Sequence, residues 1–396
     1  MNGDYTSESP QNVKFCDLVK QYNLHRDNID RRIGDVLKHG IFINGPEVSE
    51  FETKLKQFLR IKYAIGVSSG TDALFLSLIA LGIKEGDFVI SPAFNFIAVA
   101  EVSSLLGAIP VFVDVDEDSF NLSAEKLKEF LDNPYHPYIN DKVPYERIKV
   151  VVGVDLFGQC ADYDEINRIA KNHNLYVIED GAQSLGAEYK ERKALTLGDI
   201  NCTSFYPAKP LGCFGDGGAV FTNDDVLAEK IQLLKNHGQK GKYNHVSHGL
   251  NARLDTIQAA VLLAKFDVFV REEISLRQNV ARRYIDLLTE LEKEGDIILP
   301  KIEIHSRSVW AQFSIRVLKG KRDALRDYLK SFGIPAAVHY PKPLHFQPSM
   351  EFLGYKEGAF PVSEMISQEI LSLPFHPYLE EEETLFICGK IFEFFS

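Results

Sequence analysis

One lysine stands in an unusually stiff stretch of the chain. Lys209 lies between Pro207 and Pro210, after a short β-type run, and four glycines follow it within ten residues. Proline fixes its own φ and restricts the residue before it, so the backbone around Lys209 is stiff. Such a backbone suits a lysine that must hold one covalent geometry. A tight loop with a solvated lysine is the alternative, and this stretch alone does not decide between them.

The segment Ser69-Gly70-Thr71-Asp72 lies where a predicted strand runs into a predicted helix. The first turn of a helix offers free N–H groups and the positive end of the helix dipole, which together suit a phosphate. An ordinary helix cap is the alternative interpretation. Neither a G-x-G-x-x-G nor a Walker pattern is present, which disfavours a dinucleotide-binding or P-loop protein.

Two acids, Glu179 and Asp180, close a predicted buried strand. Ligands of open α/β sheets bind at the carboxyl ends of the strands, and a carboxylate there can pair with a protonated ring nitrogen. A helix cap or a turn is the alternative. A buried strand seldom ends in two acids without a partner for at least one of them.

A lysine, a strand-end acid and a phosphate cup are together the set that pyridoxal 5′-phosphate (PLP) needs. The lysine forms a Schiff base, the acid keeps the pyridine nitrogen protonated, and the ring becomes an electron sink. Ser204 comes from the same stretch as Lys209. Phe96 is a candidate for contact with the ring face, although a single aromatic residue is more often part of the core.

Two further groups could bind a substrate. Arg253, within Asn251–Asp255, could grip a carboxylate with two hydrogen bonds. His339 and Tyr340 end a predicted strand. A surface ion pair or a packed turn explains either group equally well. We predict no metal site, because the spacing of three loop histidines fits no standard ligand set: His237, His245 and His248.

Composition narrows the class of protein. The chain has 396 residues, 45% of them hydrophobic, and a formal net charge of −12. This charge argues against nucleic acid or a membrane surface as a partner, but it does not exclude a small anion. The five cysteines form no CxxC motif, which predicts reduced thiols in a cytoplasmic protein. The first residues do not resemble a signal peptide, and no apolar run reaches the ~18 residues of a membrane span.

Alternating strands and helices between residues 63 and 222 predict an α/β fold with a mostly parallel sheet covered on both faces. We expect an N-terminal arm at 1–48, a large domain at 49–275 and a smaller α+β domain at 276–396. The segment 132–145 is predicted to be a surface loop. In the last domain we expect strands at 310–317 and 336–340, and helices around 362–371 and 381–395.

The chain resembles the DegT/DnrJ/EryC1/StrS sugar aminotransferases, of PLP fold type I, over nearly its full length. The motifs that carry this resemblance, in chain order, are Asn44–Val48, Ser69–Leu74, Glu179–Ser184, Ser204–Gly212, Gly215–Gly218 and Asn251–Asp255. Four further runs are similar to one subgroup, the UDP-2-acetamido-2-deoxy-ribo-hexuluronate 3-aminotransferases of bacterial O-antigen synthesis: Asp155–Asp162, Lys209–Cys213, Ala337–Pro341 and Leu373–Tyr378.

The resemblance implies a homodimer with shared active sites that uses a UDP-linked keto-sugar and L-glutamate, which leaves as 2-oxoglutarate. It implies that Lys209 binds PLP covalently and shuttles the proton, while Asp180 pairs with the pyridine nitrogen. Its other implied cofactor contacts are Gln183 at the ring hydroxyl, Phe96 against the ring, Gly70, Thr71 and Ser204 at the phosphate, and Asn251 at the phosphate from the partner subunit. The implied sugar-nucleotide contacts are Arg253, His339 and Tyr340, with Arg253 at the uronate carboxylate.

The chain departs from the family pattern at a few positions. Asn95 and Val99 stand where many relatives have threonine, Gly181 replaces a common alanine, and the insertion 132–145 is longer than expected. Two alternatives share the fold. A sugar dehydratase would have histidine in place of Lys209. A ligand-binding regulator would not need Lys209, Asp180 and the phosphate cup together.

Overall fold

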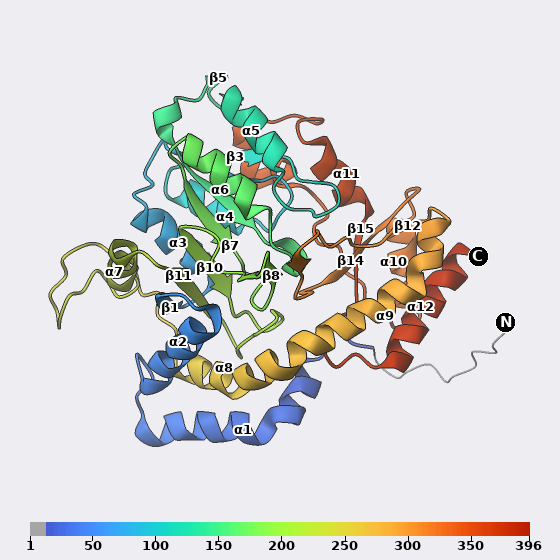
Figure 1. Cartoon of the computed structure of the whole chain (residues 1–396), viewed down its shortest axis with the longest axis horizontal. Coiled ribbons are helices and arrows are strands. Elements are labelled where there is room, and N and C mark those ends of the chain that lie inside the picture. The colour runs from blue at the N-terminus through green and yellow to red at the C-terminus, as the bar shows by residue number, and fades with distance from the viewer. Residues whose placement is uncertain (1–12) are drawn as a thin grey trace.

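A seven-stranded sheet lies at the centre of the structure, a computed structural model that describes residues 13–396 (Figure 1). The strand order is β1-β11-β10-β7-β6-β2-β3, and β11 runs in the opposite direction to the other six strands. The predicted α/β fold is confirmed. The strands are β1 (Tyr63–Val67), β2 (Phe88–Pro92), β3 (Ile109–Val113), β6 (Ile148–Val154), β7 (Tyr176–Asp180), β10 (Ile200–Ser204) and β11 (Gly218–Thr222).

Helices cover both faces of this sheet, as parallel strands require. Side chains alternate along each strand, so neighbouring residues enter two separate hydrophobic cores. On one face lie α2 (Pro46–Leu59), α5 (Ala124–Asp132), α6 (Tyr163–Asn172) and α8 (Thr256–Val268). On the other face lie α3 (Gly70–Ala80), α4 (Ala98–Leu105) and α7 (Asp225–Leu234).

One long helical element joins the large sheet to the C-terminal part of the chain. α8 continues through η3 (Phe269–Glu273), a π-helical turn, into α9 (Ile274–Lys293), which runs diagonally across Figure 1. Our predicted domain boundary near residue 275 therefore falls within continuous helix. The three-part division of the chain stays a prediction.

The C-terminal part is built on a small antiparallel sheet of β12 (Ile297–Ile298), β14 (Phe313–Val317) and β15 (Ile370–Leu373). Its apolar face packs with α9 and with helices α10 (Arg322–Ser331) and α12 (Glu381–Phe395). The predicted strand at 336–340 is wrong: this segment makes one isolated bridge, between Ala337 and Ser372. The predicted helix at 362–371 ends earlier, as α11 (Pro361–Glu369), and its last residues begin β15.

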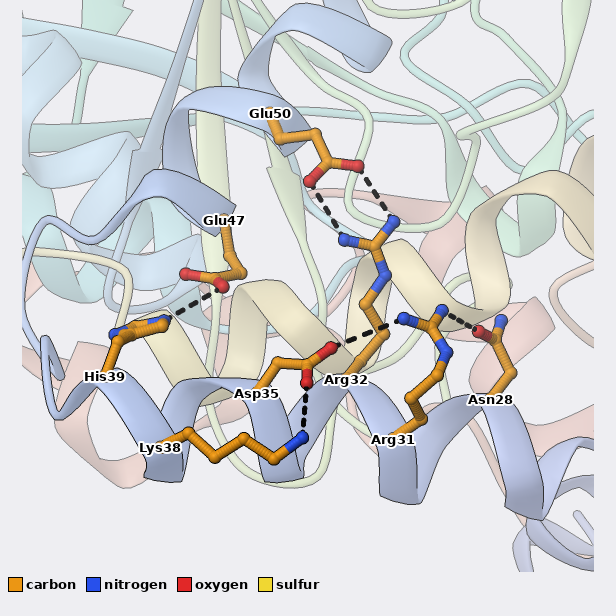
Figure 2. Close-up of polar contacts among 8 residues, drawn as sticks. All are labelled: Asn28, Arg31, Arg32, Asp35, Lys38, His39, Glu47 and Glu50. Carbon is orange, nitrogen blue, oxygen red and sulfur yellow. Dashed lines mark hydrogen bonds and ion pairs between the residues drawn. The ribbon is translucent and has the colours of Figure 1, made fainter.

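The first two helices among the described residues pack on the large domain's helical layer. α1 (Leu18–His39) lies along α8 and ends at Gly40, whose φ of 69° is the left-handed conformation that glycine adopts easily. Figure 2 shows how α1 holds α2: Arg32 donates two hydrogen bonds to Glu50, both of 2.9 Å, and His39 pairs with Glu47. These side-chain contacts join α1 to α2.

The remaining short elements lie around this frame. The 132–145 segment contains a small hairpin, β4 (Tyr135–His136) with β5 (Asp141–Lys142), so it is more ordered than the predicted loop. The others are η1 (Tyr145–Arg147), η2 (Leu156–Gly158), η4 (Leu344–Phe346), η5 (Pro348–Leu353), β8 (Glu188–Tyr189), β9 (Arg192–Lys193) and β13 (Ser306–Arg307). Among the helices of residues 13–396, none is long and apolar enough to cross a membrane.

Candidate active site

The residues of the predicted phosphate cup lie at the N-terminus of α3. Ser69 caps the helix by accepting a hydrogen bond from the Asp72 N–H, so the cap interpretation is correct, and the phosphate role stays a prediction. The N–H groups of Gly70 and Thr71 belong to the first turn, which has no acceptors within its own helix. Ser204, at the end of β10, lies against Gly70: a Cβ on Gly70 would come within 2.7 Å of the Ser204 Cβ. Glycine is therefore needed where helix and strand meet.

Asp180 ends β7 on the same side of the sheet. It is buried, one of its oxygens accepts the Ala182 N–H at 3.1 Å, and the other accepts no hydrogen bond from the described residues. Burial raises the pKa of Asp180, while the Ala182 hydrogen bond and then Lys209 act in the opposite direction. The second oxygen is therefore able to accept a hydrogen bond from a protonated ring nitrogen, which is the role predicted for Asp180.

Gln183 lies in the turn after β7, and a backbone hydrogen bond fixes its side chain. Its side-chain oxygen accepts the backbone N–H of Phe157 at 2.8 Å. Phe157 lies in η2 with a φ of 58°, a left-handed conformation that bulky residues seldom adopt. With its oxygen occupied in this way, Gln183 turns its NH₂ group away from Phe157 as a donor. A donor at this position fits the predicted contact with a ring hydroxyl.

Lys209 sits in a closed loop between Phe205 and Cys213, which we call the lysine loop. The Cys213 N–H donates to the Phe205 carbonyl at 2.8 Å, and the Lys209 N–H donates to the Tyr206 carbonyl at 2.9 Å. A Cβ on Gly212 would meet the Pro207 carbonyl oxygen at 2.3 Å. The stiff loop predicted from the two prolines is thus closed by the backbone itself.

The Lys209 side chain is close enough to Asp180 for each to shift the titration of the other. Burial lowers the pKa of Lys209, and Asp180 partly offsets this effect. Within residues 13–396 the Lys209 ammonium makes no hydrogen bond or ion pair. A lysine with a lowered pKa and no fixed partner is suited to act as a nucleophile and as a base.

His339 and Tyr340 approach from the small sheet, although no strand carries them. The His339 Nδ1 lies 2.9 Å from the Ser372 hydroxyl, and its pKa is lowered by burial and by Lys209. Burial also raises the pKa of Tyr340, which a side-chain hydrogen bond with Gln183 lowers. Both residues therefore lie close to the Lys209–Asp180–Gln183 group, and their predicted contact with the sugar nucleotide stays a prediction.

Phe96 lies beside Tyr340, with ring centroids 6.1 Å apart, and the residue is 53% exposed. An aromatic residue of the core would be covered, so the alternative interpretation of Phe96 does not hold. Its exposed ring face at the edge of this group is suited to stack on a planar ligand.

The start of the described chain also reaches this group. The Phe375 N–H donates to the Phe15 carbonyl at 2.9 Å, and Val13 enters the core of the small sheet. The Phe15 ring lies 5.8 Å from the His339 ring, centroid to centroid. The sequence contained no signal for this contact, because residues 13–18 lack any motif.

Asn251 and Arg253 lie elsewhere. Asn251 is exposed and forms a backbone bridge with Asn236, and Arg253 donates to the Asn236 side chain at 2.8 Å. No contact among residues 13–396 joins either of them to Lys209. The structure of one chain thus brings together every predicted site residue except these two.

A pair of buried acids behind Asp180 was missed by the sequence analysis. Asp155, at the end of β6, accepts from Ser184 at 2.6 Å, and Glu179 accepts the N–H groups of Leu195 and Leu197. Burial raises the pKa of both acids, and the proximity of Asp155 raises that of Glu179 further. With Cys160, their ligand atoms lie within 4.8 Å of one another. Since backbone and hydroxyl groups already satisfy these carboxylates, we interpret the pair as a support for the turn after Asp180.

The group fits PLP on four structural grounds. Among residues 13–396, one Asp180 oxygen, the Lys209 ammonium and the first N–H groups of α3 have no hydrogen-bond partner, and Phe96 exposes an aromatic face. Each ground corresponds to one part of the cofactor: ring nitrogen, aldehyde, phosphate and ring face.

Comparison with known proteins gives consistent matches over nearly the whole chain. The sequence profile described as the DegT/DnrJ/EryC1/StrS aminotransferase family matches residues 23–392. The UDP-2-acetamido-2-deoxy-3-oxo-D-glucuronate aminotransferase of Pseudomonas aeruginosa is 44% identical over 379 residues, which cover 96% of this chain and 99% of that protein. A "pleiotropic regulatory protein" of Geobacillus stearothermophilus is 40% identical over 97% of this chain and 99% of its own length.

A solved structure adds the cofactor. The NtdA protein of Bacillus subtilis, crystallised with the cofactor PMP, superimposes with a TM-score of 0.87 at 29% identity. The superposition covers 99% of this chain and 86% of that one. PMP is the amino form of PLP, so this neighbour binds the same cofactor that the geometry of the Lys209 group fits.

Proposed function

The chain belongs to the DegT/DnrJ/EryC1/StrS aminotransferase family and is PLP-dependent; we propose that it aminates UDP-2-acetamido-2-deoxy-3-oxo-glucuronate at C3, with L-glutamate as donor. The observation that carries this proposal is the Lys209–Asp180–Gln183 group in a chain 44% identical to an aminotransferase named for that substrate. The product would serve bacterial surface polysaccharide synthesis such as O-antigen. We also propose a cytoplasmic location, which the five free cysteines support.

Each residue of the group has one task in this reaction. When bound, PLP supplies an aldehyde and a ring that accepts electrons. Lys209 Nζ takes the proton from Cα of glutamate, and in the second half-reaction it returns a proton to C3 of the sugar. Asp180 holds a proton on the ring nitrogen. The α3 N-terminus and Ser204 hold the phosphate, and Gln183 donates to the ring hydroxyl.

In this proposal, three residues bind the sugar nucleotide. His339 and Tyr340 contact it within the same chain, on the side of the small sheet. Arg253 binds the uronate carboxylate, because a guanidinium matches a carboxylate with two hydrogen bonds. Since the Arg253 and Asn251 side chains lie apart from Lys209 in one chain, we propose that both act on the site of the partner subunit.

Exposed apolar side chains support such a dimer. Ile41, Phe42 and Ile43 are each between 44% and 49% exposed. The Phe42 carbonyl accepts the Thr256 N–H, which places this patch directly beside the 251–255 segment. A second copy of the chain would cover the patch and would receive that segment.

A panel of substrates tests the proposal. The purified protein is incubated with glutamate and with a set of UDP- and dTDP-linked keto-sugars. Some of these sugars carry the ketone at C3 and others at C4, and some carry a carboxylate and others do not. Products are identified by mass and NMR. We expect the 3-keto uronate to react fastest. Preference for a sugar without the carboxylate would contradict the role of Arg253, and amination at C4 would contradict the regiochemistry.

The lysine is tested separately. Lys209→Ala should lose the visible absorbance of bound PLP and all turnover, and normal turnover would overturn the assignment.

One observation favours a second candidate function, the 40% identity to a protein named as a regulator. Glutamate separates the two: an aminotransferase converts its bound cofactor to the amine form and changes its spectrum, whereas a regulator leaves the spectrum unchanged.

A further inference from the structure

A buried lysine that the proposed reaction does not use lies directly beneath the lysine loop. Lys265 of α8 is 2% exposed, and its ammonium donates a hydrogen bond to the Gly212 carbonyl. Gly212 is the residue whose close approach to Pro207 closes the loop. No carboxylate within the described residues lies within ion-pair distance of Lys265. The Gly212 carbonyl is therefore the direct partner of this buried charge.

The same face of α8 holds the loop at a second point. Gln258, two turns before Lys265, accepts the Phe214 N–H at 2.8 Å and donates to the Phe214 carbonyl at 3.3 Å. The Lys265 ammonium also lies 5.7 Å from the centroid of the Phe214 ring. Residues seven apart share one side of an α-helix, so a single stripe of α8 contacts the exit of the lysine loop.

The π-turn after α8 brings further charges to this stripe. Glu273 and Arg277 are both buried, and both influence the titration of Lys265. Burial lowers the pKa of Lys265 to about 8, and Glu273 is the largest influence in the opposite direction. Because a π-turn holds more residues than an α-turn, it shifts the following residues around the helix axis. Such turns occur frequently at functional sites.

Glu273 is in turn tied to both ends of the chain. It accepts a hydrogen bond from Gln21 of α1 at 2.8 Å and another from the Tyr378 hydroxyl at 2.6 Å. Removing one member of a buried charged cluster leaves the others unsatisfied, so such clusters hold a defined geometry. The cluster thus joins α1, the long helix and the C-terminal segment behind Lys209.

We propose that Lys265 is a positioning residue of the aminotransferase, which fixes the lysine loop through the Gly212 carbonyl and so holds Lys209 at the reacting carbons. The inference rests on the proposed role of Lys209. Lys265 touches neither cofactor nor substrate, and it acts on both half-reactions because Lys209 moves the proton in both. A cation buried against a carbonyl in this way carries a desolvation cost that a merely structural contact would not require.

Single-turnover kinetics test the proposal. In Lys265→Met, the limiting rate constants of the glutamate and keto-sugar half-reactions should fall by a similar factor, about 10- to 100-fold, since a displacement of about 1 Å can cost this much. The dissociation constants of both substrates and of PLP should change little, because their binding residues are untouched. Hydrogen exchange, read by mass spectrometry, should be faster in the peptide 205–213. Lys265→Gln keeps an N–H donor and should recover part of the rate.

Lys230→Met is the control for loss of a lysine–carbonyl hydrogen bond. The ammonium of the exposed Lys230 donates to the Ala80 carbonyl at 2.9 Å, at the far end of α3. This variant should keep both rate constants. If Lys265→Met fails to fold, Lys265→Gln is compared with the wild type, with slower half-reactions and faster exchange expected.

Three results would overturn the inference: unchanged rate constants in a folded Lys265 variant, a loss confined to one half-reaction, or a loss expressed only as weaker binding. Turnover by Lys209→Ala would instead overturn the proposed function on which the inference rests. The two failures are thus distinguishable.

Discussion

The residues of the site differ from ordinary surface residues in their charge states. Burial is the largest influence on Lys209, Asp180 and His339: it lowers the pKa of the lysine and the histidine and raises that of the aspartate. Each shift favours the neutral form. The free base of Lys209 is the form that takes a proton, so burial prepares this residue for its proposed task.

His339 offers a test at this scale. Its Nδ1 pairs with the Ser372 hydroxyl, which lies 2.8 Å from the Ser314 hydroxyl. Ser372→Ala removes the hydrogen-bond partner of the His339 Nδ1, so the imidazole ring is no longer held in one orientation. The loss amounts to about one hydrogen bond, and we therefore expect the KM for the keto-sugar to rise about 2- to 10-fold. The glutamate half-reaction should be unchanged. Ser314→Ala keeps the His339 contact and serves as control. An equal loss in both half-reactions would show that His339 does not act on the sugar.

Most of the site could be predicted from single residues because motifs carry them. The stiffness around Lys209, the acid after a buried strand and the capped start of α3 are local features that the sequence displays directly. The contacts that fix these residues could not be predicted in the same way. Phe15 and Ser372 meet His339 from opposite ends of the chain, and no local pattern encodes such a meeting.

At the scale of the elements, strand alternation separates two adjacent acids. Glu179 and Asp180 follow one another on β7, so they point to opposite faces of the sheet. Asp180 faces the site, and Glu179 faces Asp155 across the pairing of β6 with β7, in which Val154 lies opposite Asp180. A signal for this pair existed in the sequence: two parallel strands, each followed or ended by an acid, must bring those acids to one edge.

The buried pair predicts an unusual dependence of stability on pH. The folded-state pKa of Asp155 is raised to about 6, above the ordinary value near 4. Between about pH 4 and pH 6 the folded state holds a proton that the unfolded state has lost, so the free energy of unfolding falls as pH rises through this window. Asp155→Asn removes this loss. We expect the variant to be more stable than the wild type above pH 7, by about 1–3 kcal/mol, and the gain to vanish near pH 4.

Urea unfolding of the two proteins between pH 4 and pH 8 measures this difference. Asp164→Asn is a suitable control, because Lys190 lowers the pKa of that carboxyl and its removal should bring no gain at high pH. A constant difference between Asp155→Asn and the wild type at every pH would mean that Asp155 is ionised throughout.

At the scale of the whole molecule, most of the fold could be predicted and the ends of the elements could not. The alternation of strands and helices between residues 63 and 180 predicted the mostly parallel sheet. The errors lie in the small sheet, where 336–340 and 362–371 have apolar residues that fit a strand or a helix equally well. Pairing with distant strands determines the structure of these two segments. Ser372 forms a bridge with Ala337, and β15 pairs with β14.

Mixing two inactive variants tests whether the site is shared between subunits. If Asn251 acts in the partner's site, a mixed dimer of Lys209→Ala with Asn251→Ala holds one site with both residues intact and one with neither. Random exchange should restore about a quarter of the wild-type activity, because half of the dimers are mixed and each has one complete site of two. Each variant alone serves as control. No recovery in mixtures proven to contain mixed dimers would place Asn251 in its own chain's site.

If His339 contacts the sugar nucleotide as we propose, its contact with Phe15 makes residues 13–15 part of the substrate site. A truncation that removes Val13–Phe15 would uncover both the His339 ring and the core of the small sheet. A protein shortened at this end should therefore bind PLP normally and yet discriminate poorly between sugars. Proteolytic trimming during purification would have the same effect, and a preparation could lose its selectivity while its yellow colour persists.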